Sequence, residues 1–248
     1  MPAVLIFTAL LVETHGRGFL AKYFPDDSIY NSDAVIEVKC DILKFGNIRF
    51  FIDFRNDLYM GKQPDKPVSL DPRNAHYYLT PGLSMDINDL ILTGCIVHDC
   101  IHDIDIENPG TPVFNRFRFI IEPGGFNIRN RSRRVVDQPL WRLMLGSYPR
   151  FPSIYAWTNW GADYKYEMRL DLLTPIVKKN RSYLGLGLSS HVIRREERGF
   201  YQRHIIRGEW ALYGSDGIFM PFISYTIYSD DPLRSPGQMG VFGIEVLY

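Results

Sequence analysis

The sequence lacks the features that mark several classes of protein. Its three cysteines, Cys40, Cys95 and Cys100, are odd in number and form no C-x-x-C pair, so they predict neither a disulfide framework nor a zinc knuckle. Lysine plus arginine number 28, as do aspartate plus glutamate, so no overall positive field attracts nucleic acid and we expect no nucleic-acid partner. No apolar run reaches the roughly 18 residues that a membrane-spanning helix needs.

What is present is a folded composition, with 46% hydrophobic and 14% aromatic residues, which excludes a disordered chain. An apolar run of 11 residues occupies positions 2–12. Its length fits the core of an export signal, but no lysine or arginine precedes it and no clean small-residue cleavage site follows it. Residues 1–30 are therefore left open between an export-signal remnant and the first strand of the fold.

The dominant pattern is an alternation of polar and apolar residues, and no segment carries a sustained helical stripe. Residues 155–172 show this best, because one face of that strand is charged and the other is apolar with aromatics. The charged face includes Asp163, Lys165, Glu167 and Arg169, and the apolar face includes Trp160, Tyr164, Tyr166, Met168, Leu170 and Leu172. A strand of these 18 residues is about three times the usual length. Such length favours a strand that crosses a membrane.

The same alternation recurs along the chain, and short turns alternate with longer polar connections. We expect strands at 34–43, 48–59, 77–85, 90–104, 114–121, 155–172, 183–192, 200–213, 218–228 and 239–248. A polar inner face and an apolar outer face are the signature of a transmembrane β-barrel. The residues expected to line its lumen are Glu37, Lys39, Arg49, Asp53, Arg55, Asp163, Lys165, Glu167 and Arg169.

The fold expected is thus all-β: a transmembrane, antiparallel, up-and-down barrel of 10 to 12 strands. Twelve is favoured because bacterial barrels have even numbers of strands. Two further strands would come from residues 126–135 and from a segment before residue 30. Residues 31–248 then form a single barrel domain.

The last ten residues, Met239 to Tyr248, end on an aromatic with Val246, Ile244, Phe242 and Gly240 on its own side. This segment resembles the C-terminal signal strand of Gram-negative outer-membrane β-barrel proteins. The resemblance implies a location in the bacterial outer membrane and recognition of this strand by the barrel-assembly machinery. It names no family within that class, so it implies no reaction.

The densest cluster of reactive side chains is the segment from Cys95 to Asp105. His98, Cys100 and His102 share one face of a strand, and we expect them to point into the barrel near its long-loop rim. Two of them could hold a metal with Asp103 or Asp105, but the ligand spacing for a metal site is missing. We therefore predict no metal and no cofactor.

The same segment resembles outer-membrane phospholipase A, a 12-stranded barrel with a His-x-Ser-Asn-Gly core on one strand. Here His98 is followed by Cys100 at the serine position, Ile101 at the asparagine position and His102 at the glycine position. These departures remove the nucleophile and its partner in their usual form. A Cys100 thiolate activated by His98 or His102 remains chemically feasible.

Two further groups are candidates. Ser189 and His191 share a strand face, as a nucleophile and a base would. Arginine binds phosphate through its planar fork, so arginines in a long loop suggest contact with lipid and lipopolysaccharide head groups. The arginines expected to do so are Arg129, Arg131, Arg133 and Arg134.

Three functions are compatible with these patterns. The first is a structural or narrow-pore outer-membrane barrel with a charged lumen. The second is an outer-membrane lipid-modifying enzyme of the phospholipase or lipid A deacylase type, using the His98 segment or Ser189 and His191. The third is a soluble β-sandwich binding module.

Overall fold

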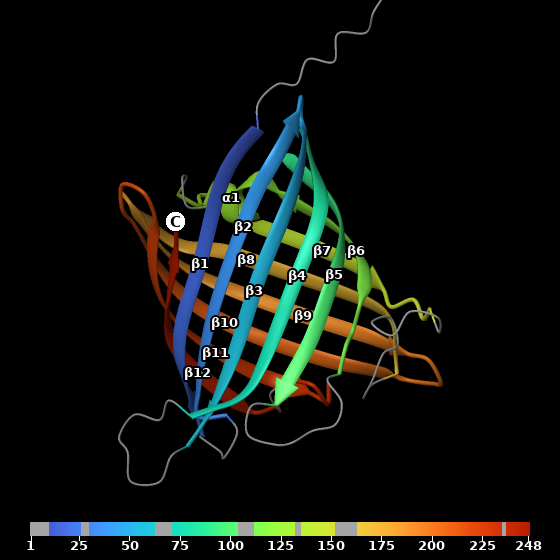
Figure 1. Cartoon of the computed structure of the whole chain (residues 1–248). Helices are drawn as coiled ribbons and strands as arrows, with labels where there is room; N and C mark the ends of the chain where they lie inside the picture. Colours follow the sequence, from blue (N-terminus) through green and yellow to red (C-terminus); the bar gives the residue numbers. More distant parts are fainter. Residues whose placement is uncertain are drawn as a thin grey trace, which may run out of the picture.

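The computed structural model describes residues 10–25, 30–62, 71–103, 112–131, 135–151, 163–234 and 237–248. These residues form one antiparallel sheet that closes on itself, because each strand pairs with its neighbours in sequence and β1 pairs with β12 (Figure 1). The strands are β1 (Leu10–Phe24), β2 (Ser32–Phe45), β3 (Ile48–Gly61), β4 (Asp71–Ile87), β5 (Leu90–Asp103), β6 (Arg116–Pro123), β7 (Leu140–Ser147), β8 (Tyr164–Lys179), β9 (Ser182–Arg195), β10 (Phe200–Tyr213), β11 (Ile218–Ser229) and β12 (Met239–Leu247).

The prediction of a closed antiparallel barrel with 12 strands is confirmed for the described residues. The alternative of a β-sandwich is wrong, because the strands belong to one closed sheet rather than two stacked ones. A strand before residue 30 is present as β1. Among the described residues, no helix is long and apolar enough to cross a bilayer.

The expected strand at 126–135 is wrong. The chain instead forms a 3-10 turn, η1 (Gly124–Phe126), and one turn of helix, α1 (Ile128–Arg131). Two consecutive glycines weaken a strand at this point, and the Asn127 side chain accepts the backbone N–H of Arg129 at 3.2 Å, as an N-cap does. The strand that completes the sheet is β7, which follows α1 in sequence.

Along most strands the side chains alternate between a buried inward face and an exposed outward face. On β9, Leu184, Leu186 and Leu188 are exposed on the outward face, whereas Tyr183 is fully buried. The outward residues of β12, Phe242, Ile244 and Val246, are likewise apolar and exposed. A band of this kind matches the lipid-facing surface of a membrane barrel.

The first turn of β8 departs from the expected alternation. Tyr164 is buried and points inward, whereas Lys165 is exposed and lies against the ring of Tyr166. The cause is a bulge, because the register of β8 against β9 shifts between Tyr164 and Tyr166. From Tyr166 to Leu172 the expected alternation holds. Trp160 lies outside the described residues.

The two rims of the barrel differ. One, the short-turn rim, carries the hairpins between β2 and β3, β4 and β5, β8 and β9, and β10 and β11. Tight turns there need a left-handed residue, which Gly46 (φ 60°) and Asn180 (φ 48°) supply. The opposite, long-loop rim carries the connection from β9 to β10 and that from β11 to β12.

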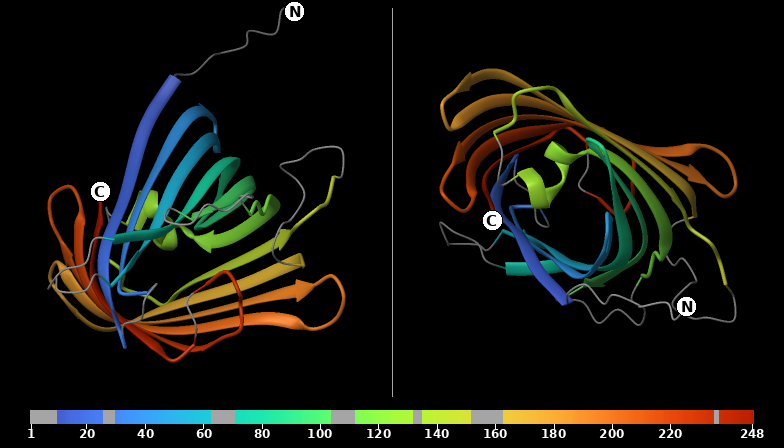
Figure 2. Two further views of the ribbon diagram at one scale, coloured as in Figure 1. Left: turned by 60° about the horizontal axis from the view of Figure 1, so that its bottom comes forward. Right: turned by 90° about the horizontal axis from the view of Figure 1, so that it is seen from above.

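The lumen is occupied at both rims. Near the short-turn rim, α1 lies inside the ring of strands (Figure 2). Its Arg129 pairs with Asp86 of β4 at 2.8 Å, and its Arg131 pairs with Glu209 of β10, so α1 links opposite walls. At the long-loop rim the connection from β11 to β12 turns inward, and its Asp231 accepts the hydroxyl of Tyr164.

Leu186→Arg tests the outward face. Leu186 is 52% exposed in the central part of β9, so a charge there would meet lipid and destabilise the folded barrel by about 2–4 kcal/mol. The control is Gly187→Ser on the inward face, where a new Cβ meets nothing closer than the Leu172 carbonyl oxygen at 3.4 Å. Its cost should stay under about 1 kcal/mol. Reversible unfolding in lipid vesicles measures both, and equal losses would contradict the assignment of faces.

Candidate functional site

His98 and Cys100 lie on the outward face of β5, which corrects the expectation that they point into the barrel. Cys95 and Val97 are buried inside against Phe51 and Tyr78, whereas Ile96 is 40% exposed outside. Alternation from Ile96 then carries His98, Cys100 and His102 outward, toward the long-loop rim. The sequence did not reveal the face because both faces of β5 are apolar before His98.

Asn115 joins this outward group, and the sequence analysis did not identify it. Its Oδ1 lies 2.7 Å from Nδ1 of His98, and the residue is only 3% exposed. The backbone holds it there: Phe114 N–H donates to the Asp99 carbonyl at 2.7 Å, and Cys100 and Val113 form a β-bridge. Because Phe114 and Arg116 point inward, Asn115 between them points outward.

The contact with Asn115 selects one tautomer of a neutral His98 ring. An amide oxygen only accepts hydrogen bonds, so Nδ1 of a neutral His98 carries the proton and Nε2 keeps its lone pair. Cys100 stands two residues along the same face, about 6.6 Å away between Cα atoms, and its thiol donates to the Tyr77 carbonyl at 3.8 Å. A thiol, a base and an amide that orients the base make up the set that nucleophilic catalysis by cysteine uses. We call His98, Cys100 and Asn115 the His98 group.

His102 takes no part in the His98 group. It is exposed near the end of β5, and its ring packs edge-on against Tyr77 with centroids 5.3 Å apart.

A second outward polar group lies on β9 and β10, and the sequence analysis missed it too. Ser190 and His204 are cross-strand partners, with 2.9 Å between Oγ and Nδ1, and His204 Nε2 lies 3.2 Å from Gln202 Oε1. We call these three residues the Ser190 group. Leu188 and Ile206, both 41% exposed, flank it on the same face.

The expected pair Ser189 and His191 lies on the inward face and does not act as a unit. Ser189 hydrogen-bonds to Asp171, and His191 Nε2 lies 3.1 Å from Glu167 Oε2. Each is thus bound to its own carboxylate, and no hydrogen bond joins the two described side chains. This pairing places both residues in the wall of charges inside the barrel.

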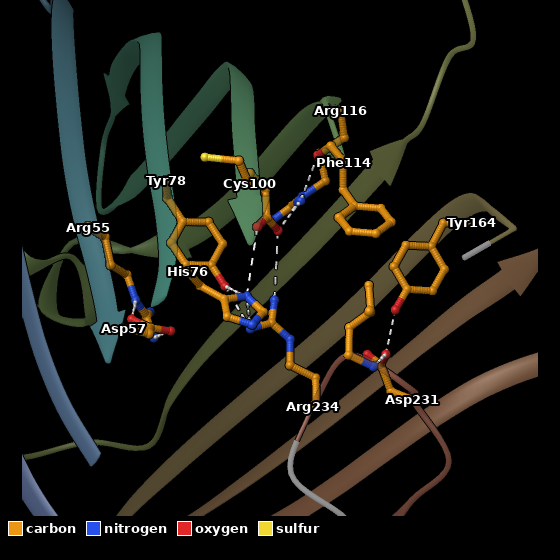
Figure 3. Close-up of polar contacts among 12 residues, drawn as sticks. Arg55, Asp57, His76, Tyr78, Cys100, Phe114, Arg116, Tyr164, Asp231 and Arg234 are labelled. Carbon is orange, nitrogen blue, oxygen red and sulfur yellow. Dashed lines mark hydrogen bonds and ion pairs between the residues drawn. The ribbon is translucent and has the colours of Figure 1, made fainter. Parts of the chain in front are cut away.

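The inward charges form a network that reaches the long-loop rim (Figure 3). Arg116 donates to Asp99 at 2.8 Å, and Arg234, from the connection between β11 and β12, donates to the Tyr78 hydroxyl at 2.6 Å. Burial alone would lower the pKa of Arg234. The neighbouring groups outweigh this effect and hold that pKa well above its usual value; they are Tyr78, Tyr59, Asp99 and Asp231. Figure 3 shows the Cys100 sulfur pointing away from this network.

The other residues expected in the lumen are distributed as follows. The structure places Glu37, Lys39, Arg49, Asp53, Arg55, Glu167 and Arg169 on the inward face. Lys165 lies outside because of the bulge in β8. Asp163 lies at the long-loop rim, where burial works against ionisation but hydrogen bonds from Arg195 and Tyr201 lower the pKa of its carboxyl group.

The arginines expected to contact lipid head groups do not all lie in a surface loop. Arg129 and Arg131 belong to α1, and their guanidinium groups pair with carboxylates inside the lumen. The reason is that the glycine break after β6 sends the chain into the barrel rather than away from it. Arg133 and Arg134 lie outside the described residues.

Comparisons with known proteins agree with the fold. The structure matches outer membrane phospholipase A from Escherichia coli with a TM-score of 0.54 and 8% identity, over 97% of this chain and 98% of that chain. It also matches Salmonella typhi outer membrane phospholipase, solved as a dimer with bound calcium, with a TM-score of 0.53 and 8% identity, over 96% and 92% of the two chains. At this identity the likeness shows an outer-membrane barrel fold and nothing finer. No family model and no curated protein sequence matches the chain.

Glu167→Gln tests the charged interior. Glu167 pairs with Arg118 at 2.7 Å and with buried Arg116 at 3.3 Å, so the change takes the carboxylate from Arg118 and leaves Arg116 with Asp99 alone. We expect the free energy of unfolding to fall by about 3–5 kcal/mol. Lys165→Gln, two residues away but exposed, should change it by less than about 0.5 kcal/mol. Chemical denaturation in vesicles measures both, and a larger effect at Lys165 would refute the bulge.

Proposed function

We propose that this protein is an outer-membrane enzyme that cleaves acyl esters of membrane lipids at the outer surface of its barrel. The observation that carries the proposal is the 2.7 Å contact between His98 and Asn115 on the face that also holds Cys100. A histidine hydrogen-bonded to a buried carboxamide on the outward face is costly to desolvate, and an apolar band needs neither residue. Their position favours a substrate that approaches from the bilayer.

An apolar groove lined by Ile96, two residues before His98 on the same strand face, supports a lipid substrate. It has a volume of about 720 Å³. Gly94 lies between Leu83 and Phe119 in the register of the sheet, and its missing side chain opens the groove on the face that continues to His98. Ile96 and Leu145 line it as well. An extended acyl chain fits such a surface, with its ester toward the rim.

The chemistry assigned to the three residues is a thiol-based acyl transfer. His98 Nε2 takes the proton of the Cys100 thiol as the sulfur attacks the ester carbonyl carbon. The bond to the alcohol oxygen then breaks, and the departing lysolipid takes that proton, leaving a thioester on Cys100. Water, deprotonated by His98, cleaves the thioester to fatty acid and thiol. Asn115 holds the His98 ring in position.

The remaining features fit the same location. Two of the solved structures that share the fold are named as outer membrane phospholipases. The apolar outward band and the aromatic C-terminus of residues 239–248 support insertion into the outer membrane of a Gram-negative bacterium through its assembly machinery. Lipid of that membrane, including lipopolysaccharide, is then the partner that the outward face meets.

A structural barrel is the second candidate function. The ion pairs that α1 makes with both walls, and the entry of Asp231 and Arg234 at the other rim, fill the lumen with side chains. A filled lumen supports a closed wall and disfavours a pore of useful width. It is equally compatible with an enzyme whose reaction takes place outside the barrel.

Fatty acid release from phosphatidylcholine vesicles by the refolded protein tests the proposal. Cys100→Ala and His98→Ala should lower the rate by about 10²-fold or more, and Asn115→Ala by less, because the base remains. Cys40→Ala, also outside the lumen, should keep the wild-type rate. Vesicles containing lipid A replace the phospholipid in a second arm.

Ser190→Ala completes the experiment. If it abolishes hydrolysis while Cys100→Ala does not, the Ser190 group is the catalytic one and the assignment to Cys100 is overturned. If the folded wild-type protein releases no fatty acid from either lipid, the enzyme proposal fails and the structural barrel is the function that remains.

A further inference from the structure

Two carboxylates face each other inside the barrel near the short-turn rim. Glu13 of β1 and Asp41 of β2 are direct cross-strand partners, and both lie on the inward face. Like charges directly opposite each other in a sheet are destabilising. Asp41 is only 2% exposed, so water does not screen this repulsion. A positive charge between the two carboxylates would relieve it.

His15 completes a set of three. It lies two residues after Glu13 on the same face and is also 2% exposed. One nitrogen of His15 and one carboxylate oxygen each of Glu13 and Asp41 lie within 4.8 Å of one another. The distance from His15 Nε2 to Glu13 Oε1 is 3.8 Å. Two ligands of a tetrahedral zinc ion stand about 3.4 Å apart, so small side-chain rotations bring these atoms to that spacing.

The neighbouring cations do not satisfy Asp41. Arg49 and Arg129 approach it at 3.8 and 3.6 Å, but both donate their hydrogen bonds to Asp86. The ammonium group of Lys39 lies 4.0 Å from the centre of the Phe51 ring. Neither carboxylate oxygen of Asp41 accepts a hydrogen bond from the described part of the chain. A buried carboxylate without a hydrogen bond is costly unless something else binds it.

We propose that Glu13, His15 and Asp41 bind a divalent transition-metal ion on the inner wall of the barrel. One imidazole nitrogen and two carboxylate oxygens are ligands that zinc accepts, with water at the fourth position. This site is separate from the His98 group, which lies on the outward face near the opposite rim.

The position of the site gives the metal a structural role. Arg17 is the first residue of β1 in the ladder with β12, and Tyr248 exchanges backbone hydrogen bonds with Gly16. Glu13 and His15 lie beyond that point, where the described part of β1 pairs with β2 alone. A metal held by both strands fastens this overhang, next to the seam where the barrel closes.

Zinc binding to the refolded full chain in detergent tests the proposal after chelator treatment and dialysis. We expect one zinc per chain by elemental analysis and calorimetry, and a rise in Tm of about 5 °C at saturating zinc. Affinity should fall in acid, because a protonated histidine cannot bind metal. His15→Ala and Asp41→Asn should each weaken binding at least tenfold.

The controls separate loss of the site from loss of the fold. His102→Ala, an exposed histidine outside the barrel, should bind zinc like the wild type. Circular dichroism and heat-dependent gel mobility report folding, and Glu13→Gln replaces Asp41→Asn if the latter fails to fold. Zinc below a tenth of an equivalent in the wild type, or unchanged affinity in folded His15→Ala, would overturn the site. Neither result depends on whether the protein hydrolyses lipid.

Discussion

Closure of the sheet between β1 and β12 determines which residues this protein can bury. Because each strand hydrogen-bonds to a neighbouring strand on both sides, the sheet has no long edge of unpaired backbone groups. Such a sheet can therefore span a bilayer. Closure also separates two surfaces that a flat sheet would expose equally. One becomes an apolar exterior and the other an interior in which side chains from different strands pack against one another, as Tyr148, Tyr164 and Ile193 do.

The enclosed interior explains why so many charges are paired. A carboxylate such as Glu167 is 4% exposed and would be strongly destabilising alone, but two arginines, His191 and the Tyr148 hydroxyl surround it. Buried ion pairs of this kind contribute little net stability, yet losing one partner is expensive. The network therefore fixes which side chains must lie opposite each other. Arg129 and Arg131 apply the same constraint to α1.

Much of this fold could be predicted because period two is a local property. Alternating residues mark strands, and a segment before residue 30 was needed to complete the sheet. Three features depend on more than alternation. The glycines at 124 and 125 direct the chain inward, so the strand expected at 126–135 is absent and the next strand of the sheet is β7. The bulge at Tyr164 reversed the faces of two residues. On β5, apolar side chains on both faces left the orientation of His98 undetermined.

The candidate site was harder to predict than the barrel, since its members come from different strands. Spacing within β5 identified His98 and Cys100, but Asn115 lies 17 residues beyond His98 and meets it only because β5 and β6 are neighbours. Ser190 and His204 are 14 residues apart and meet in the same way.

Outward polar residues carry more information in a membrane barrel than inward ones. Inside, a histidine or serine has many charged neighbours and needs no special role, as Ser189 and His191 illustrate. Outside, most neighbours are leucine, isoleucine or phenylalanine, and a hydrogen-bonded polar cluster there costs desolvation without improving contact with lipid. The His98 group and the Ser190 group are both clusters of this kind on the outward face. For that reason the chemistry of this protein is better sought on its wall than in its lumen.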